Sequence, residues 1–214
     1  APVVNFTLGL KPTKTVMDAV LKVDKHRTFP KYASKTFEKW YKKNVAAFQN
    51  SFPRHVSMFH GCYVNYNYPQ LGKDLVSVMN ALGYGVHLLE NEKCCGTALI
   101  SNGMIDQAKR NAANNIESMR KSVYERQMPV ISTSSSCTFT MRDEYPHLLG
   151  VKNEDVRDYI ELATRFIYKL IDQDKVKLVF KKGYKAKVAY HTPCHMERLG
   201  WGIFSTELIK MIPG

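Results

Sequence analysis

The sequence predicts an α/β fold in which a mostly parallel sheet is covered by flanking helices. After Pro53, short apolar segments of strand length alternate with longer segments whose apolar residues recur at helical spacing. This alternation is typical of β-α-β units, whose connections bring parallel strands into one sheet. Hydrophobic residues make up 44% of the 214 residues, which is enough to form a substantial core.

Residues 1–54 predict a basic, helical N-terminal extension. Apolar residues at helical spacing indicate two short amphipathic helices, near 16–23 and 37–48. Residues 1–60 contain eleven basic and three acidic residues, so they carry +8 of the formal net charge of +12. Such a surface suits an anionic membrane or an acidic partner, or is simply solvated. No nucleic-acid-binding motif accompanies it, so we expect no nucleic-acid partner.

The remaining chain predicts four strands, each followed by a helix. The expected strands are 56–60, 86–89, 129–132 and 187–191. The expected helices are about 71–82, 104–123, 155–171 and 202–212. Because His191 and Cys194 repeat the pattern of His60 and Cys62, the fourth strand is expected to open a duplicate of the first unit. The expected domains are therefore 1–54, a first repeat at 55–185, and the truncated start of a second repeat at 186–214.

All five cysteines lie just beyond the end of an expected strand. Cys62 follows the first strand, Cys94 and Cys95 the second, Cys137 the third and Cys194 the fourth. The carboxyl ends of parallel strands lie along one edge of a sheet, where open α/β folds bind their ligands. We therefore expect these side chains to meet in space.

The vicinal pair Cys94-Cys95 favours cofactor or redox chemistry. Neighbouring Cα atoms are about 3.8 Å apart, whereas disulfides need roughly 4.4–6.8 Å, so the two would pair only with strain. Adjacent thiolates are better suited to bind different irons of one cluster, and Gly96 would let the backbone approach a bulky group. The alternative is two buried, small apolar side chains.

These motifs resemble those of a known family. Cys62, thirty-one further residues, Cys94-Cys95-Gly96 and then Ser134-Ser135-Ser136-Cys137 together resemble the CCG cysteine-rich domain. That domain is found in the B subunits of heterodisulfide reductases, in iron-sulfur subunits of glycolate and lactate oxidases, and in the C subunits of anaerobic glycerol-3-phosphate dehydrogenases. The strings at 8–15, 60–67, 133–145 and 190–197 are most similar to the last group.

The resemblance implies an iron-sulfur electron-transfer subunit without catalytic residues of its own. It implies a cluster of the 4Fe-4S type held by Cys62, Cys94, Cys95 and Cys137, with Cys194 as a further cofactor-binding residue. It also implies electron relay from a flavin-containing catalytic dimer towards menaquinone. The subunit would be attached peripherally at the cytoplasmic face of the inner membrane.

The sequence departs from the fullest family pattern. Ser134 stands where that pattern has a cysteine, so the first repeat offers at most four thiolates. The ferredoxin-like domain expected before Ala1 and the closing cysteines expected after Gly214 are absent, so we expect a piece of a larger subunit. The roles of Ser134, His60 and His191 stay open.

Two other functions remain as alternatives. The first is a docking module that binds a structural zinc ion or no metal, although paired Cys-x-x-Cys knuckles are absent. The second is a cysteine hydrolase in which His195 or His191 activates Cys194, although no orienting acid is evident.

Overall fold

The computed structural model describes residues 1–180 and 186–213, and its described strands form one parallel sheet. The strands are β1 (Arg54–Phe59), β2 (Tyr84–Leu88), β3 (Val130–Ser132) and β4 (Ile160–Leu162). Their order is β2-β1-β3-β4, and each neighbouring pair is parallel. The predicted α/β fold with a parallel sheet is therefore confirmed.

Helices precede the sheet, connect its strands and follow it. The described α-helices are α1 (Pro2–Gly9), α2 (Lys11–Leu21), α3 (Phe37–Asn44), α4 (Gly61–Tyr66), α5 (Pro69–Ala81), α6 (Thr97–Ser101), α7 (Ile105–Arg120), α8 (Ser135–Phe139), α9 (Tyr145–His147), α10 (Ala163–Asp172), α11 (Cys194–Arg198) and α12 (Gly202–Lys210). Short 3-10 segments are η1 (Ala46–Ser51) and η4 (Arg157–Tyr159), and π-helical turns are η2 (Lys121–Glu125) and η3 (Thr140–Glu144).

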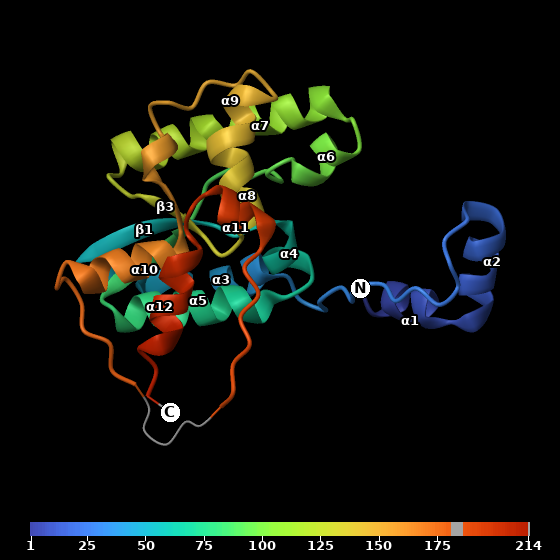
Figure 1. Cartoon of the computed structure of the whole chain (residues 1–214), viewed down its shortest axis with the longest axis horizontal. Helices are drawn as coiled ribbons and strands as arrows, with labels where there is room; N and C mark the ends of the chain where they lie inside the picture. The colour runs from blue at the N-terminus through green and yellow to red at the C-terminus, as the bar shows by residue number, and fades with distance from the viewer. Residues whose placement is uncertain (181–185, 214) are drawn as a thin grey trace.

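The two faces of the sheet carry separate apolar clusters. Val56 and Met58 of β1 face α3, α5 and α10, whereas Phe59 faces the side covered by α7. Figure 1 shows α5 and α10 on one side of the strands and α7 on the other. Because side chains of a strand alternate between faces, one apolar strand supplies both clusters.

Two expected elements differ from the structure. The expected helix at 155–171 begins only at Ala163, because residues 160–162 pair with β3 as the fourth strand. The expected strand at 187–191 is wrong, since that segment has no strand structure. Val188 and Tyr190 are both exposed, so the segment buries no apolar face that would hold it on a sheet.

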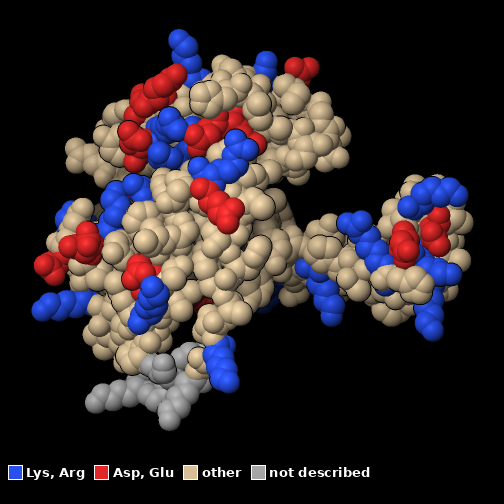
Figure 2. Space-filling model, viewed as in Figure 1, with Lys and Arg blue, Asp and Glu red and all other residues tan. Residues whose placement is uncertain are grey.

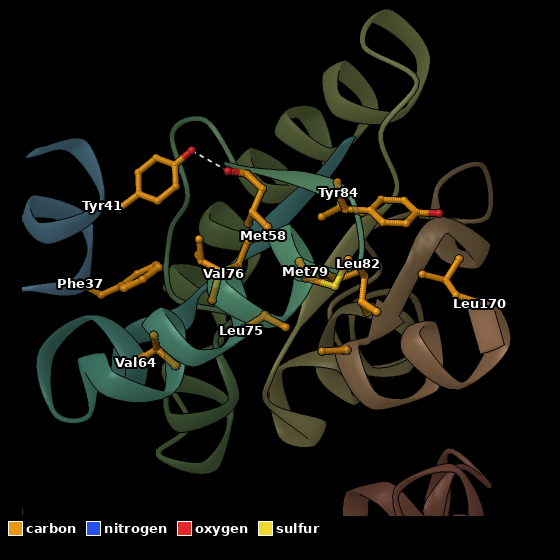
Figure 3. Packing of buried hydrophobic residues seen from close by; sticks show 14 residues of the cluster. Phe37, Tyr41, Met58, Val64, Leu75, Val76, Met79, Leu82, Tyr84 and Leu170 are labelled. Atoms are coloured by element: carbon orange, nitrogen blue, oxygen red, sulfur yellow. Dashed lines mark hydrogen bonds between the residues drawn. The ribbon is translucent and has the colours of Figure 1, made fainter. Parts of the chain in front are cut away.

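The N-terminal region has two parts with different environments. α1 and α2 project from the body (Figure 1) and contain no buried residue. α3 instead packs into the core through Phe37 and Tyr41. Figure 3 shows these two side chains beside residues of β1 and α5. The division at residue 54 stays a prediction, and residues 37–44 share a core with the sheet.

Helix α3 and the 3-10 segment η1 cover the edge of the sheet at β2. Val86 of this edge strand accepts a hydrogen bond from Tyr41 Oη at 2.6 Å, drawn as a dashed line in Figure 3. Its N–H donates to Gln49 Oε1 at 2.8 Å. Unpaired edge groups can recruit another strand, so these side chains protect the edge. No described helix combines the length and apolar character needed to cross a membrane.

Candidate functional site

Four cysteines meet at the carboxyl edge of the sheet. Cys62 lies in the first turn of α4 after β1, Cys94 and Cys95 lie in the loop after β2, and Cys137 lies in α8 after β3. All four are free thiols. The thiols lie close enough to perturb one another's pKa values, Cys62 with Cys94 and Cys137, Cys94 with Cys95, and Cys95 with Cys137. Their role as ligands stays a prediction.

Interactions among the four thiols shift their pKa values in opposite directions. Bonds from Cys62 and Cys95 lower the pKa of Cys94, and a bond from Cys95 lowers the pKa of Cys137. The pKa of Cys62 is raised by its bond to Cys94 and by burial, and that of Cys95 by its bonds to Cys137 and Cys94. A lowered pKa favours the thiolate, which is the form that binds metals.

Two glycines and a serine shape the backbone around the thiols. Gly61 and Gly96 have φ values of +69° and +97°, a region that favours glycine. A Cβ on Gly61 would lie 3.5 Å from Cys137 Sγ, so glycine leaves space beside that sulfur. Ser134 Oγ caps α8 by accepting the N–H of Cys137 at 3.2 Å, and its side chain helps to lower the pKa of Cys137.

A buried glutamate joins the first two cysteine loops. The carboxylate of Glu92 accepts the backbone N–H groups of His60 and Gly61 at 2.9 and 2.8 Å. Burial raises the pKa of Glu92 to about 8 and lowers the pKa of His60, whose Nδ1 lies 3.1 Å from the same carboxyl group. Glu92 therefore ties the loop of Cys94 to the turn that carries Cys62.

A row of hydroxyl groups supports the buried Cys95. Its Sγ lies 3.3 Å from Thr97 Oγ1, which lies 2.7 Å from Thr140 Oγ1. The Thr140 hydroxyl donates in turn to the carboxylate of Glu144. The innermost thiol is thus held by polar groups from α6 and η3.

The outer thiols open on a cavity of about 760 Å³. Cys62 and Cys94 line it together with Glu92, Lys42 and Lys93. Cys95 is buried, with 4% of its surface exposed. A reactant or protein partner therefore has access to the thiols through Cys62 and Cys94.

The fifth cysteine has a different environment. Cys194 is exposed at the start of α11, so the expectation that it follows a strand is wrong. Among the described residues, it is not one of the groups that perturb the pKa values of the other four thiols. The neighbouring His195 points towards Ser136, with Nδ1 and Oγ 2.9 Å apart, and stacks on Phe139 with ring centroids 4.9 Å apart. This arrangement does not favour His195 as a base for Cys194. His191 is exposed.

Sequence reasoning missed the polar residues that surround the thiols. Within residues 1–180 and 186–213, no three His, Cys, Asp or Glu side chains converge on one point that would hold a metal ion. Glu92, Thr97 and three asparagines of α7 instead contact the cysteine loops. The only available signal was the cluster of polar residues next to the cysteines and on the polar face of the amphipathic helix 104–123.

Comparison with known families assigns the class of this domain. Residues 56–142 match the family described as the cysteine-rich domain, CCG. They include β1 to β3 and the four cysteines at the sheet edge. The chain therefore contains a CCG cysteine-rich domain.

The comparison with curated proteins shows which individual proteins the chain is similar to. The whole chain is 52% identical to the C subunit of anaerobic glycerol-3-phosphate dehydrogenase from Escherichia coli K12 and covers 53% of that protein. It is 32% identical over 165 residues to the D subunit of dihydromethanophenazine:CoB–CoM heterodisulfide reductase from Methanosarcina mazei, a match that spans 74% of the chain and 38% of the relative. It is 33% identical over 150 residues to lactate utilization protein A of Bacillus velezensis, a match that spans 67% of the chain and 59% of the relative. The chain thus spans about half the length of the first of these relatives. Comparison with solved structures found no match.

Proposed function

We propose that this chain is part of the iron-sulfur electron-transfer subunit of an anaerobic glycerol-3-phosphate dehydrogenase. The observation that carries the proposal is the group of four interacting thiols at the carboxyl edge of the sheet, in a chain 52% identical to a protein of that dehydrogenase. The subunit would relay electrons from a flavin-containing catalytic dimer towards menaquinone and would have no substrate-oxidising residues.

The donor set fits an iron-sulfur cluster. Four thiolates satisfy the ligand count of one 4Fe-4S cluster, and Cys62, Cys94, Cys95 and Cys137 would hold it. Bound there, the cluster would supply one-electron transfer.

The residues of this chain would set the environment of that cluster. Burial of Cys95 keeps water from the inner thiol, whereas Cys62 and Cys94 face the cavity. Thr97 and Ser134 are placed to hydrogen-bond thiolate sulfur, which stabilises negative charge. Electrons would enter or leave through the exposed side, by close approach of a partner.

Membrane attachment would use the projecting arm, defined as residues 2–21, which are α1, Leu10 and α2. Its exposed apolar side chains are Val3, Val4, Phe6, Leu10, Val16, Val20 and Leu21. Figure 2 shows Lys and Arg side chains on the same arm. Apolar side chains with flanking basic residues are suited to an anionic lipid surface. We propose peripheral binding at the cytoplasmic face of the inner membrane.

Iron and acid-labile sulfide analysis after anaerobic purification tests the cluster. The wild-type chain and C194S should carry iron and sulfide, and C95S should lose the brown chromophore. Zinc in place of iron, or no metal in anaerobic wild type, would instead support the alternative of a docking module. Equal iron in C95S would contradict the ligand assignment.

Sedimentation with vesicles tests the arm. Wild type should sediment with anionic phosphatidylglycerol vesicles at low salt, and the F6S/V20S variant should remain in the supernatant. V179S is a matched control, because Val179 is 95% exposed and lies outside the arm. Equal sedimentation of all three proteins would show that the arm does not bind lipid.

A further inference from the structure

We infer that three asparagines of α7 position the vicinal cysteines by binding the backbone of their loop. Asn114 Nδ2 donates to Asn91 O at 2.7 Å, and Asn111 Nδ2 donates to Cys94 O at 3.2 Å. Asn115 binds both backbone groups of Lys93, accepting its N–H at 2.8 Å and donating to its C=O at 3.1 Å. The three residues, Asn111, Asn114 and Asn115, are called the asparagine row below.

Helical spacing places the asparagine row on one face of α7. Residues three and four positions apart are neighbours on a helix surface, so all three amides reach the same loop. Asn115 is fully buried, and its Nδ2 also contacts Tyr145 Oη at 3.0 Å. An amide this buried needs partners, and the loop supplies most of them.

Close packing brings α7 against the loop that it holds. Ala108 is fully buried, and a Cβ added to Gly96 would lie 3.5 Å from its Cβ. The small side chain of alanine and the missing Cβ of glycine together allow this approach. The loop thus meets α7 at Gly96 as well as through the asparagine row.

The asparagine row replaces hydrogen bonds that the loop cannot obtain from the sheet. Residues 91–95 lie beyond the end of β2 and outside any described helix, so their backbone groups take part in no strand pairing and no hydrogen bonds within a helix. A side-chain amide that binds both the N–H and the C=O of one residue acts as a substitute strand. The consequence is a fixed direction for the Cys94 and Cys95 side chains.

The asparagines are therefore positioning residues for the thiols. For cluster binding this inference rests on the proposed function, but the placement of the thiols also applies to the metal-free chain. A fixed direction matters, because outer groups that orient metal ligands change metal affinity and potential.

The test compares N111A and N111L with Q107A as a matched control on α7. Alanine and leucine favour helix more than asparagine does, so loss of α7 itself is not the expected result. N111L keeps the shape of the side chain but lacks its donor. Gln107 is exposed on the same helix, which makes its variant a control for a change in helix surface.

The first measurement is iodoacetamide alkylation of Cys94 in reduced, metal-free chain, followed residue by residue by mass spectrometry. Loss of one hydrogen bond worth about 1 kcal/mol corresponds to roughly a fivefold change. We therefore expect roughly fivefold faster alkylation in N111A and N111L and the wild-type rate in Q107A. A faster rate in N111A alone would assign the effect to packing and overturn the hydrogen-bond role.

The second measurement is the midpoint potential of the anaerobically prepared, iron-loaded proteins. N111A and N111L should shift it relative to wild type and Q107A, whereas a merely structural role would leave it unchanged. Wild type without iron, but with altered alkylation in the variants, would contradict the proposed function and leave the positioning role standing. Iron in all proteins, with equal alkylation rates and potentials, would overturn the positioning role alone.

Discussion

Gln49 offers a sharp test of how the N-terminal segment joins the sheet. Its side chain is fully buried and makes four hydrogen bonds. It accepts the N–H of Val86 at 2.8 Å and Asn80 Nδ2 at 2.9 Å, and it donates to Asn80 Oδ1 and Val45 O, each at 3.2 Å. Replacing it with methionine keeps the length of the side chain and removes all four bonds.

The expected loss of stability follows from the groups left without partners. Q49M leaves the Val86 N–H buried and unpaired and removes two hydrogen bonds of the Asn80 amide, although Asn80 Nδ2 keeps Tyr84 O at 2.8 Å. Each unpaired buried group costs about 1–3 kcal/mol, so the free energy of unfolding should fall by about 2–4 kcal/mol. Y41F removes one bond to Val86 O and should cost only about 0.5–1.5 kcal/mol.

Urea unfolding monitored by circular dichroism and tryptophan fluorescence measures both losses. With a slope of about 2 kcal/mol per molar urea, Q49M should lower the midpoint by about 1–2 M. The Val86 amide should also lose protection from hydrogen exchange. Q70M is the matched control, because Gln70 is exposed and its side chain forms a hydrogen bond only with Asp74 among the described residues, and its effect should stay within about 0.5 kcal/mol. If Q49M is as stable as Q70M, the region before β1 does not form one cooperative unit with the sheet.

Three further variants test other parts of the fold. G72A would place its Cβ 2.7 Å from the Phe37 ring. Overpacking costs about 1–3 kcal/mol, whereas replacing glycine within a helix gains about 1 kcal/mol, so urea unfolding should show a net loss of stability. A gain in stability would contradict this packing. G96A forces a side chain at φ +97°, which should cost about 1–2 kcal/mol in the metal-free chain, and unchanged stability would argue against the left-handed backbone. Burial, with His55 and Arg126, lowers the pKa of His87 below its ordinary 6.5, so the unfolded chain binds more protons and stability should fall as pH drops through that value. H87Q should therefore give a flatter curve of unfolding free energy between pH 7 and 5, and a curve as steep as that of wild type would refute the assignment.

The sequence alone was sufficient for three of the four described strands and for the position of four cysteines at their ends. β1, β2 and β3 begin within two residues of their predicted starts, because buried parallel strands are short apolar segments bounded by turn residues. Cys62, Cys95 and Cys137 then follow three carboxyl ends that the parallel topology places at one edge. Such signals are local, so no knowledge of the folded chain is needed to see them.

The sequence pattern did not predict elements that are too short to show a repeat of apolar residues. β4 has three residues, and Ile160 continues the apolar spacing of the helix that begins at Ala163. The spacing of apolar residues therefore predicted one helix across both elements. The segment 187–191 has the alternation of a strand, but it pairs with none. Strand formation depends on a partner with free hydrogen-bonding groups and on a face to bury, neither of which periodicity reports.

Only the tertiary structure decided which polar side chains hold the site together. Glu92 reaches Gly61 across 31 residues, Asn111 reaches Cys94 across 17, and Gln49 reaches Val86 across 37. A hydrogen bond between distant segments requires one donor and one acceptor at the right place, and it leaves no repeat in the sequence. Burial of apolar surface involves many residues, so the spacing of apolar residues in the sequence predicts it. These single polar contacts instead form only when folding brings a donor and an acceptor within about 3 Å of each other.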